Sequence, residues 1–305
     1  MQDPFHDGER AVQNETGERG QAIMNGRVIA DRIPAAAVHF VSQQLACIIG
    51  GAAPNGDLWA SCLAGPAGFA ASHDDGTRLD LRLVDEGGLL RRTPPFADMQ
   101  VSDSVGALFI ETATRRRLRV NGQVASLSDD LVRLAVAGAF PNCPKYIQRR
   151  EAVQKSDTYE PLQIREGERL EDDLLAWIAA ADTFFVASAQ PGNGPVDASH
   201  RGGRPGFVRV DGNVLGIPDY PGNSMFGTLG NFAVNPRAGL VFIDFQTGRQ
   251  LQLTGAVRLD LSGGPRDPVT GGTGRWWRFT AHKWIVSPLN HAVAWTYIDA
   301  SPFNP

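Results

Sequence analysis

The sequence predicts a mainly β protein, built from two copies of a small Greek-key barrel. Two blocks of sequence recur in the same order along the 305 residues. Most apolar segments are short, rich in β-branched and aromatic residues, and bounded by Gly, Pro or Asn, as strands are. Segments with helical spacing are few. Several short antiparallel strands with one or two helices per unit are typical of small barrels.

The duplication is visible in two pairs of aligned blocks. WASCLAGPAGF aligns without gaps with DASHRGGRPGF, which places Ser61 138 positions before Ser199. GALFIETATRRRLRVNGQV matches GLVFIDFQTGRQLQLTGAV at the similar spacing of 133, with Arg116 opposite Arg249. Blocks repeated in one order at nearly one spacing indicate two copies of a structural unit.

The repeat divides the chain into four segments. We expect an N-terminal extension over 1–34, a first barrel unit over 35–150, a charged, irregular linker over 151–170 and a second barrel unit over 171–305.

The second unit has the clearest elements. We expect its strands over 184–189, 196–200, 206–210, 214–218, 238–245 and 249–260. Acidic residues in the first turn and apolar residues at helical spacing predict a helix over 171–181. A weaker helix is expected over 223–236, ended by Asn-Pro. In the first unit, LSDDLVRLAVAGAF at 127–140 is the strongest amphipathic pattern, and we expect a helix capped by Ser128.

Composition excludes several function classes. There are 29 basic and 33 acidic residues, so the net charge of −4 does not suit a nucleic-acid binder, and the scarcity of lysine does not suit a membrane surface. The three Cys and six His lack metal-ligand spacing, and common hydrolase, P-loop and zinc-protease motifs are missing. No apolar run is long enough to span a membrane, and the acidic start does not resemble a signal peptide. We therefore expect a cytoplasmic protein that binds neither nucleic acid nor membrane and has no metal site.

The segment 192–210 is the first candidate ligand site. Ser199, His200 and Arg201 stand at the end of an expected strand and are followed by Gly202. Glycine allows close backbone approach, and Ser and Arg can bond a phosphate or the polar edge of a ring. The alternative is a glycine-rich hairpin that exposes an arginine.

The segment 217–237 is the second candidate. It is a polar turn that runs into a helix, where free amide groups bind anions. The alternative is a plain strand–turn–helix connection with Asn223 as the helix cap.

Several segments of the sequence together resemble a known family. ASHRGGRPGFVRV, IPDYPGN, TLGNFAVNPRAGLVFIDF and GRQLQLTG are similar to the FMN-binding split barrels related to pyridoxamine 5'-phosphate oxidase. FHDGERAVQNETG, LAGPAGF, TRRRLRVNG and FPNCPKYIQRR look like a bacterial subgroup in which the barrel precedes ferredoxin-reductase and [2Fe–2S] modules. The resemblance covers nearly the whole chain, which contains neither of those modules.

The resemblance implies FMN at a barrel–barrel interface, with contacts carried over by position. The flavin-contacting strand falls on 198–203, where Ala198 and Gly203 replace the family's Arg and Lys and Arg201 stands between them. A Tyr-Thr pair falls on Ile217 and Pro218. The phosphate-binding pair falls near Thr228 with no basic residue, which leaves the phosphate to Ser199, Arg201, Asn223, Asn231 and amide groups. Gln250 matches the family's Gln. The full expected set is Ser199, His200, Arg201, Gly202, Ile217, Pro218, Asn223, Thr228, Asn231 and Gln250.

The first unit is expected to supply the opposite wall of the cleft. It has Cys62, Leu63 and Ala64 where the second unit has His200, Arg201 and Gly202, so it lacks donors for a phosphate. Basic residues that could reach the cleft, or form a solvated patch instead, are Lys145, Arg149 and Arg150. No catalytic acid or base stands out, and His200 is the nearest residue that titrates around neutral pH.

The resulting hypothesis is an FMN-dependent oxidoreductase with one FMN per chain and an unidentified small-molecule substrate. A homodimer and a separate reductase or ferredoxin are the partners that it allows. Three alternatives stay open: a non-catalytic flavin carrier or electron-transfer component, the same fold binding deazaflavin or haem, and a barrel that has lost its cofactor.

Overall fold

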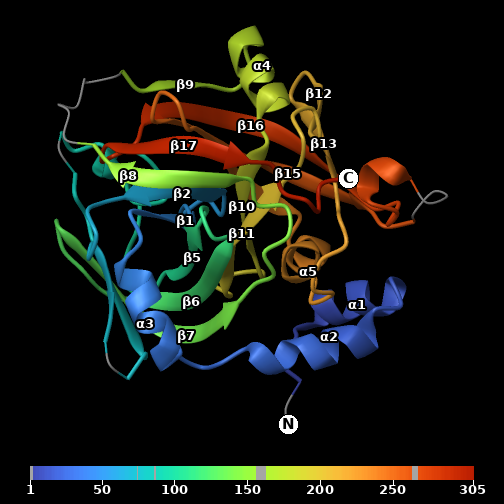
Figure 1. Cartoon of the computed structure of the whole chain (residues 1–305), viewed down its shortest axis with the longest axis horizontal. Coiled ribbons are helices and arrows are strands. Elements are labelled where there is room, and N and C mark those ends of the chain that lie inside the picture. Colours follow the sequence, from blue (N-terminus) through green and yellow to red (C-terminus); the bar gives the residue numbers. More distant parts are fainter. Residues whose placement is uncertain (1–2, 74, 86, 156–162, 263–266) are drawn as a thin grey trace.

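Two curled antiparallel sheets, one from each half of the chain, make up most of the molecule (Figure 1). The computed structural model describes residues 3–305 apart from 74, 86, 156–162 and 263–266. Strands along the whole of each sheet contribute side chains to one apolar core, so each sheet encloses its own interior. The mainly β fold of two split barrels predicted from the sequence is confirmed.

The first barrel has the strand order β2-β1-β5-β6-β7-β4-β3. Its strands are β1 Ala46–Ala52, β2 Leu58–Ala64, β3 Ala70–Ser72, β4 Arg78–Arg82, β5 Ser104–Glu111, β6 Arg116–Leu127 and β7 Leu131–Pro141.

The second barrel has the order β11-β10-β14-β15-β16-β13-β12, with β9 paired to β16. Its strands are β9 Arg165–Gly167, β10 Thr183–Ala189, β11 Val196–Gly202, β12 Arg209–Asp211, β13 Val214–Pro218, β14 Arg237–Asp244, β15 Arg249–Asp260 and β16 Trp276–Pro288. Strand for strand this repeats the first order, so the sequence repeat is also a repeat of topology. The strand expected over 206–210 begins only at Arg209.

The repeated glycines have the same role in both copies. Gly68 and Gly206 have φ of +89° and +88°, a backbone region that favours glycine. A Cβ on Gly65 or Gly203 would lie 2.6 Å from the side chain of Phe69 or Phe207. The motif therefore turns the chain tightly enough for each Phe to enter its barrel.

Helices and short turns connect and cover the barrels. They are α1 Asp7–Glu15, α2 Arg19–Asn25, η1 Gly26–Val28, α3 Ala35–Ser42, η2 Leu90–Arg92, α4 Asp172–Ala180, α5 Gly227–Val234 and η3 Pro268–Thr270. The helix expected over 171–181 is α4. The helix expected over 223–236 is the shorter α5, whose N-cap is Phe226 rather than Asn223. Figure 1 shows α1 and α2 on the same side of the molecule as α5.

The helix expected over 127–140 is wrong, because this segment is the end of β6, a turn and the strand β7. Ser128 lies in that turn, where its N–H donates to the Leu131 carbonyl at 2.9 Å. Val132 and Leu134 point into the core, so the segment has the period of a strand as well as that of a helix. Pairing with β4 on one side and β6 on the other decides between them.

The segment expected to be an irregular linker contains strands at both of its described ends. Strand β8 (Arg149–Gln154) pairs with β17 (Val293–Asp299) as a separate two-stranded sheet, and β9 joins the second barrel. The expected unit boundaries at 35–150 and 171–305 stay predictions. No helix of the described residues has the length and apolarity needed to cross a bilayer.

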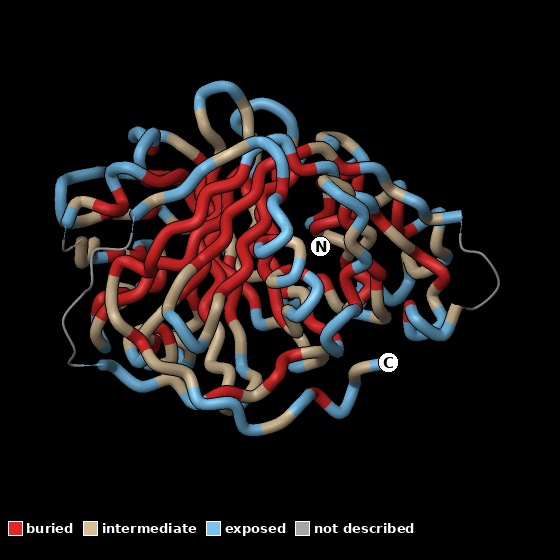
Figure 2. Tube along the Cα trace, turned by 90° about the horizontal axis from the view of Figure 1, so that it is seen from above, coloured by how far each residue is buried: buried red, intermediate tan, exposed pale blue. Residues whose placement is uncertain are grey.

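The two barrels pack against each other around an approximate two-fold relation. Their contact surface is apolar, with Ile48, Cys62 and Leu108 from one barrel against Phe185, Ala187 and Val241 from the other. The aligned glycines Gly106 and Gly239 lie at matching places in it. A Cβ on Gly106 would lie 2.6 Å from the Val196 carbonyl oxygen in β11, and one on Gly239 would lie 2.6 Å from the Leu58 carbonyl oxygen in β2. Figure 2 shows the buried strands running through the middle of the molecule.

Candidate ligand-binding site

A cavity of about 310 Å³ opens between the two barrels. One wall comes from β6 and β7 of the first barrel. The other comes from β11, the turn after β13 and the start of α5 in the second barrel, and the N-terminal segment closes one side. The first unit therefore supplies the wall of this cavity opposite the second unit, and the identification of the cavity with the expected flavin cleft stays a prediction.

Strand β11 places polar side chains on the cavity. Ser199 is buried and accepts hydrogen bonds from Thr228 Oγ1 at 3.0 Å and from Arg119 Nη2. Gly202 lies directly against the Tyr146 carbonyl, where a Cβ would collide. Gly202 therefore permits close packing of β11 against the chain at Tyr146, and the expected approach of the backbone to a ligand stays a prediction.

Strand β6 contributes two arginines from the opposite barrel. Arg119 is 8% exposed, and its Nη1 lies 3.1 Å from Asp197 Oδ2. Arg117 donates from Nε to the Cys143 carbonyl at 2.8 Å. Arg117 and Arg119, from the first barrel, therefore line the same cavity as Arg201 from the second barrel.

The cavity is lined by more cationic side chains than are neutralised by ion pairs among the described residues. Burial lowers the pKa of Arg117 and of Arg201, and the neighbouring Arg119 lowers both further, whereas the charge of Asp219 raises the pKa of Arg201. Among the described residues, Arg119 is ion-paired, whereas Arg117, Arg201 and the lining Lys145 are in no ion pair. The lining Asp219 is bonded to Arg275 at 2.9 Å. An anion is the ligand that would offset these cations.

Unpartnered buried polar atoms also gather here. Those that belong to cavity-lining residues are His6 Nε2, Arg119 Nε, His200 Nε2 and Arg201 Nε. Burial holds the pKa of His200 well below its ordinary value, and the positive charges of Arg117, Arg201 and Arg150 add to this. His200 is therefore a neutral imidazole at neutral pH, edge-on to Phe185. Such atoms indicate a polar ligand, because a buried donor without a partner is costly.

The first two turns of α5 contribute residues to the cavity wall. Thr228 and Asn231 are buried there, and Asn231 Nδ2 donates to Ser188 at 3.0 Å and to Asp197 at 3.1 Å. The N-terminal end of this helix adds partial positive charge to that of the arginines.

Eight of the ten expected residues line this one cavity: Ser199, His200, Arg201, Gly202, Pro218, Asn223, Thr228 and Asn231. Ile217 is not among the lining residues and packs in the core of the second barrel. Lys145 lines the cavity, whereas Arg149 pairs with Asp299 and Arg150 with Asp182 away from it.

Gln250 does not line the cavity. It lies on β15, at the position that corresponds by the two-fold relation to that of Arg117 on β6. Its Oε1 accepts the Cys62 N–H at 2.9 Å, and its Nε2 donates to Ser287 at 3.3 Å. Gln252 beside it donates to the carbonyls of Ala60 and Pro94. Gln250 and Gln252 are each no more than 1% exposed. Protein atoms fill this second place, so the structure brings Gln250 to the closed copy of the site.

Among the arginines that line the cavity, Arg117 and Arg119 are those that the sequence analysis did not predict. Strand registers place Arg117 opposite Ile110 and Gln250 opposite Ile243, and the repeat aligns these two pairs. The signal was therefore present, because the alignment that pairs Arg116 with Arg249 pairs Arg117 with Gln250. The alignment does not show which strands face each other in space. Strand β6 of the first barrel faces β11 of the second, and β15 of the second barrel faces β2 of the first.

No group of three or more His, Cys, Asp and Glu side chains that could hold a metal ion occurs in the part of the chain described here. The residues present suit an organic anion better than an ion of metal.

No protein-family model and no curated protein matches the chain. Among solved structures, it is similar to HupZ from Group A Streptococcus at 10% identity, over 43% of this chain and 98% of that one, with a TM-score of 0.30. A putative 5-nitroimidazole antibiotic resistance protein from Bacteroides thetaiotaomicron matches at 11% identity over 44% of this chain and 95% of that one, with a TM-score of 0.28. Apo-PhuS, a heme-binding protein from Pseudomonas aeruginosa, matches at 12% identity over 98% and 95% of the two chains, with a TM-score of 0.19. At these scores the likenesses do not decide the ligand.

Proposed function

We propose that the inter-barrel cavity binds FMN and that the chain is an FMN-dependent oxidoreductase. The observation that carries the proposal is the group of three cationic side chains, Arg117, Arg201 and Lys145, that line one cavity without an ion-pair partner in the described residues. A phosphate monoester supplies the missing negative charge, and the family resemblance of the sequence selects FMN among phosphate esters.

Different residues of the chain would bind different parts of the ligand. Arg117, Arg119 and Arg201 offer guanidinium donors that suit a phosphate, and the first turn of α5 adds amide groups. Neutral His200 offers one donor or acceptor to a polar ring edge. Phe140 and Tyr146 add aromatic surface to the cavity wall. When bound, FMN supplies hydride or electron transfer, which this set of side chains cannot perform.

The test compares FMN with riboflavin, which lacks the phosphate. We expect the wild-type protein to bind FMN more tightly by about tenfold or more, because a charge-assisted hydrogen bond contributes about 1.5–3 kcal/mol. Arg201→Met should reduce this preference, whereas Arg204→Met, an exposed arginine three residues further on, should retain it. Fluorescence titration measures both affinities. Equal affinity for the two flavins, or no binding, would contradict the proposal.

Catalysis and electron carriage are distinguished by a second experiment. The bound flavin is reduced chemically, and its reoxidation is followed with a panel of small-molecule acceptors and with ferredoxin. Rate enhancement by a small molecule supports the oxidoreductase, whereas enhancement only by ferredoxin supports an electron-transfer component.

Haem is the second candidate, and His200 favours it. Its Nε2 is buried on the cavity wall and has no hydrogen-bond partner among the described residues, and a neutral imidazole is the form that binds iron. Haem titration followed by absorption tests it. A Soret shift that His200→Ala abolishes would favour haem, and an unchanged spectrum would exclude His200 as a ligand of the haem iron.

A further inference from the structure

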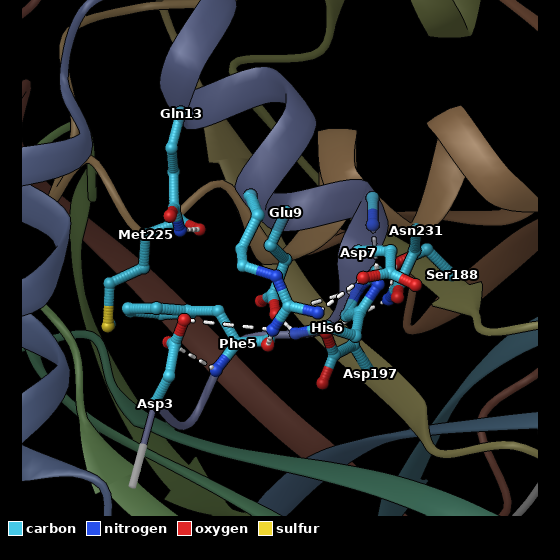
Figure 3. A network of polar contacts seen from close by, with 12 residues as sticks. Asp3, Phe5, His6, Asp7, Glu9, Gln13, Ser188, Asp197, Met225 and Asn231 are labelled. Atoms are coloured by element: carbon cyan, nitrogen blue, oxygen red, sulfur yellow. Dashed lines mark hydrogen bonds and ion pairs between the residues drawn. The ribbon is translucent and has the colours of Figure 1, made fainter. Parts of the chain in front are cut away.

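One carboxyl group in the cavity comes from neither barrel. Glu9 is in the first turn of α1 and lines the cavity beside His6 (Figure 3). Its position is fixed by close backbone contact between α1 and α5. A Cβ on Gly8 would collide with the Gly230 carbonyl, and one on Gly230 would lie 2.6 Å from Glu9 Cα. The sequence FHDGE therefore delivers a carboxyl group to the site.

Glu9 shares its surroundings with a second carboxyl group. A Cβ on Gly227 would lie 3.2 Å from Asp197 Oδ2, 3.3 Å from Arg119 Nη1 and 3.6 Å from Glu9 Oε1, so these three groups converge on one glycine. Arg119 is already paired with Asp197, which also accepts from Asn121 and Asn231. Two carboxyl groups thus face one guanidinium group.

The second carboxyl group has weaker compensation for a negative charge. Glu9 Oε2 accepts the His6 backbone N–H at 3.0 Å. Burial raises the pKa of Glu9 to about 8, and the charge of Asp197 adds to this against the opposing effect of Arg119. Asp3 also raises it slightly, and α5 contributes no titratable residue to this contact. Two like charges in one partly buried place are unfavourable, so one of the carboxyl groups keeps its proton.

His6 completes the arrangement. Its Nδ1 accepts the Gly8 N–H at 3.1 Å, which places the imidazole proton on Nε2. That Nε2 lies 3.6 Å from Glu9 Oε2 and has no hydrogen-bond partner in the described residues. Burial lowers the pKa of His6, so the ring is a neutral donor at the pH where Glu9 titrates.

We propose that Glu9 is the proton-exchanging group of the inter-barrel cavity and donates its proton to the bound ligand. The Glu9 O–H bond breaks and a bond from that hydrogen to a basic nitrogen or oxygen of the ligand forms. The electron pair remains on the Glu9 carboxylate, beside His6 Nε2–H and Arg119, and water returns the proton after the ligand leaves. The identity of the ligand rests on the proposed function, whereas the titration of Glu9 does not.

Infrared difference spectroscopy tests the titration without any ligand. Between about pH 6 and about pH 10, the wild-type protein should lose a protonated-carboxyl band with a midpoint near pH 8. Glu9→Gln should lack this change while retaining an acceptor for the His6 N–H, as capping boxes with Gln do. Glu15→Gln, an exposed residue on the same helix, should retain it. A band that persists in Glu9→Gln, or no band in the wild type, overturns the inference.

Calorimetry tests the exchange with ligand. At about pH 8, in buffers of different ionisation enthalpy, binding of FMN should take up roughly half a proton per chain, in the wild type and in Glu15→Gln but not in Glu9→Gln. Binding with equal proton uptake in all three proteins overturns the inference. Should FMN not bind, the proposed function fails by itself, and inorganic phosphate replaces FMN as the probe for the same three proteins.

Discussion

At the residue scale, two exchanges of Gln for Arg separate the open site from its closed copy. Arg117 and Arg119 on β6 occupy the places that Gln250 and Gln252 hold on β15. The glutamines bond to neighbouring backbone and stay buried. One or two backbone acceptors do not satisfy an arginine, because a buried guanidinium carries five N–H donors and a charge and needs an anion or several acceptors. Open space and positive charge therefore occur together at one of the two related places.

The first prediction concerns a variant that places in the open site the residue type found at the corresponding position of the closed one. Arg117→Gln should weaken FMN binding by about tenfold or more, since one charge-assisted contact contributes about 1.5–3 kcal/mol. Arg116→Gln changes the preceding, exposed residue of the same strand and should leave affinity unchanged. Fluorescence titration with both variants measures the difference. Equal affinities would remove Arg117 from the site.

The second residue-scale prediction concerns stability and pH. The folded-state pKa of Glu9 is raised to about 8, so the native protein holds a proton that the unfolded chain releases near its usual value of 4.5. Stability from this residue therefore falls as pH rises between these two values and is constant above pH 8. Relative to wild type, Glu9→Gln should gain stability across that interval, on the order of a few kcal/mol. Urea unfolding at stepped pH measures it, and a pH-independent difference would contradict the account.

At the element scale, pairing with neighbouring strands determines whether a segment with an ambiguous sequence pattern is a helix or a strand. The pattern of 127–140 fits a helix and a strand, and β4 and β6 on either side of β7 provide the pairing that selects the strand. By contrast α4 was predictable, because acidic residues at its start and apolar spacing agree with each other. The sequence pattern did not predict the helices α1 and α2 in the N-terminal extension. The short helix α1 packs closely against α5, and such contacts supply the stability that a helix of this length lacks by itself.

The third prediction tests that contact. Gly230→Ala places a Cβ 2.6 Å from Glu9 Cα, so α1 must move away from α5. We expect a loss of about 1–3 kcal/mol of stability, as overpacking usually causes, and faster hydrogen exchange in residues 5–15. Gly20→Ala is the matched control, because a Cβ on that helical glycine meets nothing within 4 Å. Unchanged exchange in Gly230→Ala would show that α1 is not held there.

At the scale of the whole molecule, one chain contains what resembles a dimer of barrels with one site open and one closed. The sequence predicted the duplication and most of the residues with which the second barrel lines the cavity. It did not reveal which strand of the first barrel faces β11, because that depends on how the barrels pack. Gly106 and Gly239 permit that packing by bringing the backbones together.

This asymmetry leads to the fourth prediction. Titration should end at one FMN per chain, because Gln250 and Gln252 fill the second place with bonded, buried side chains. Equilibrium dialysis measures the stoichiometry. Two equivalent sites per chain would contradict the assignment of a closed copy.

The most direct measurement is the visible absorption spectrum of the freshly purified protein, followed by heat release and mass spectrometry of any chromophore. The account predicts a flavin spectrum and released FMN at about one molecule per chain, or uptake of added FMN to that ratio by a colourless preparation. A colourless protein that takes up no FMN, or one that releases a different chromophore, would contradict it.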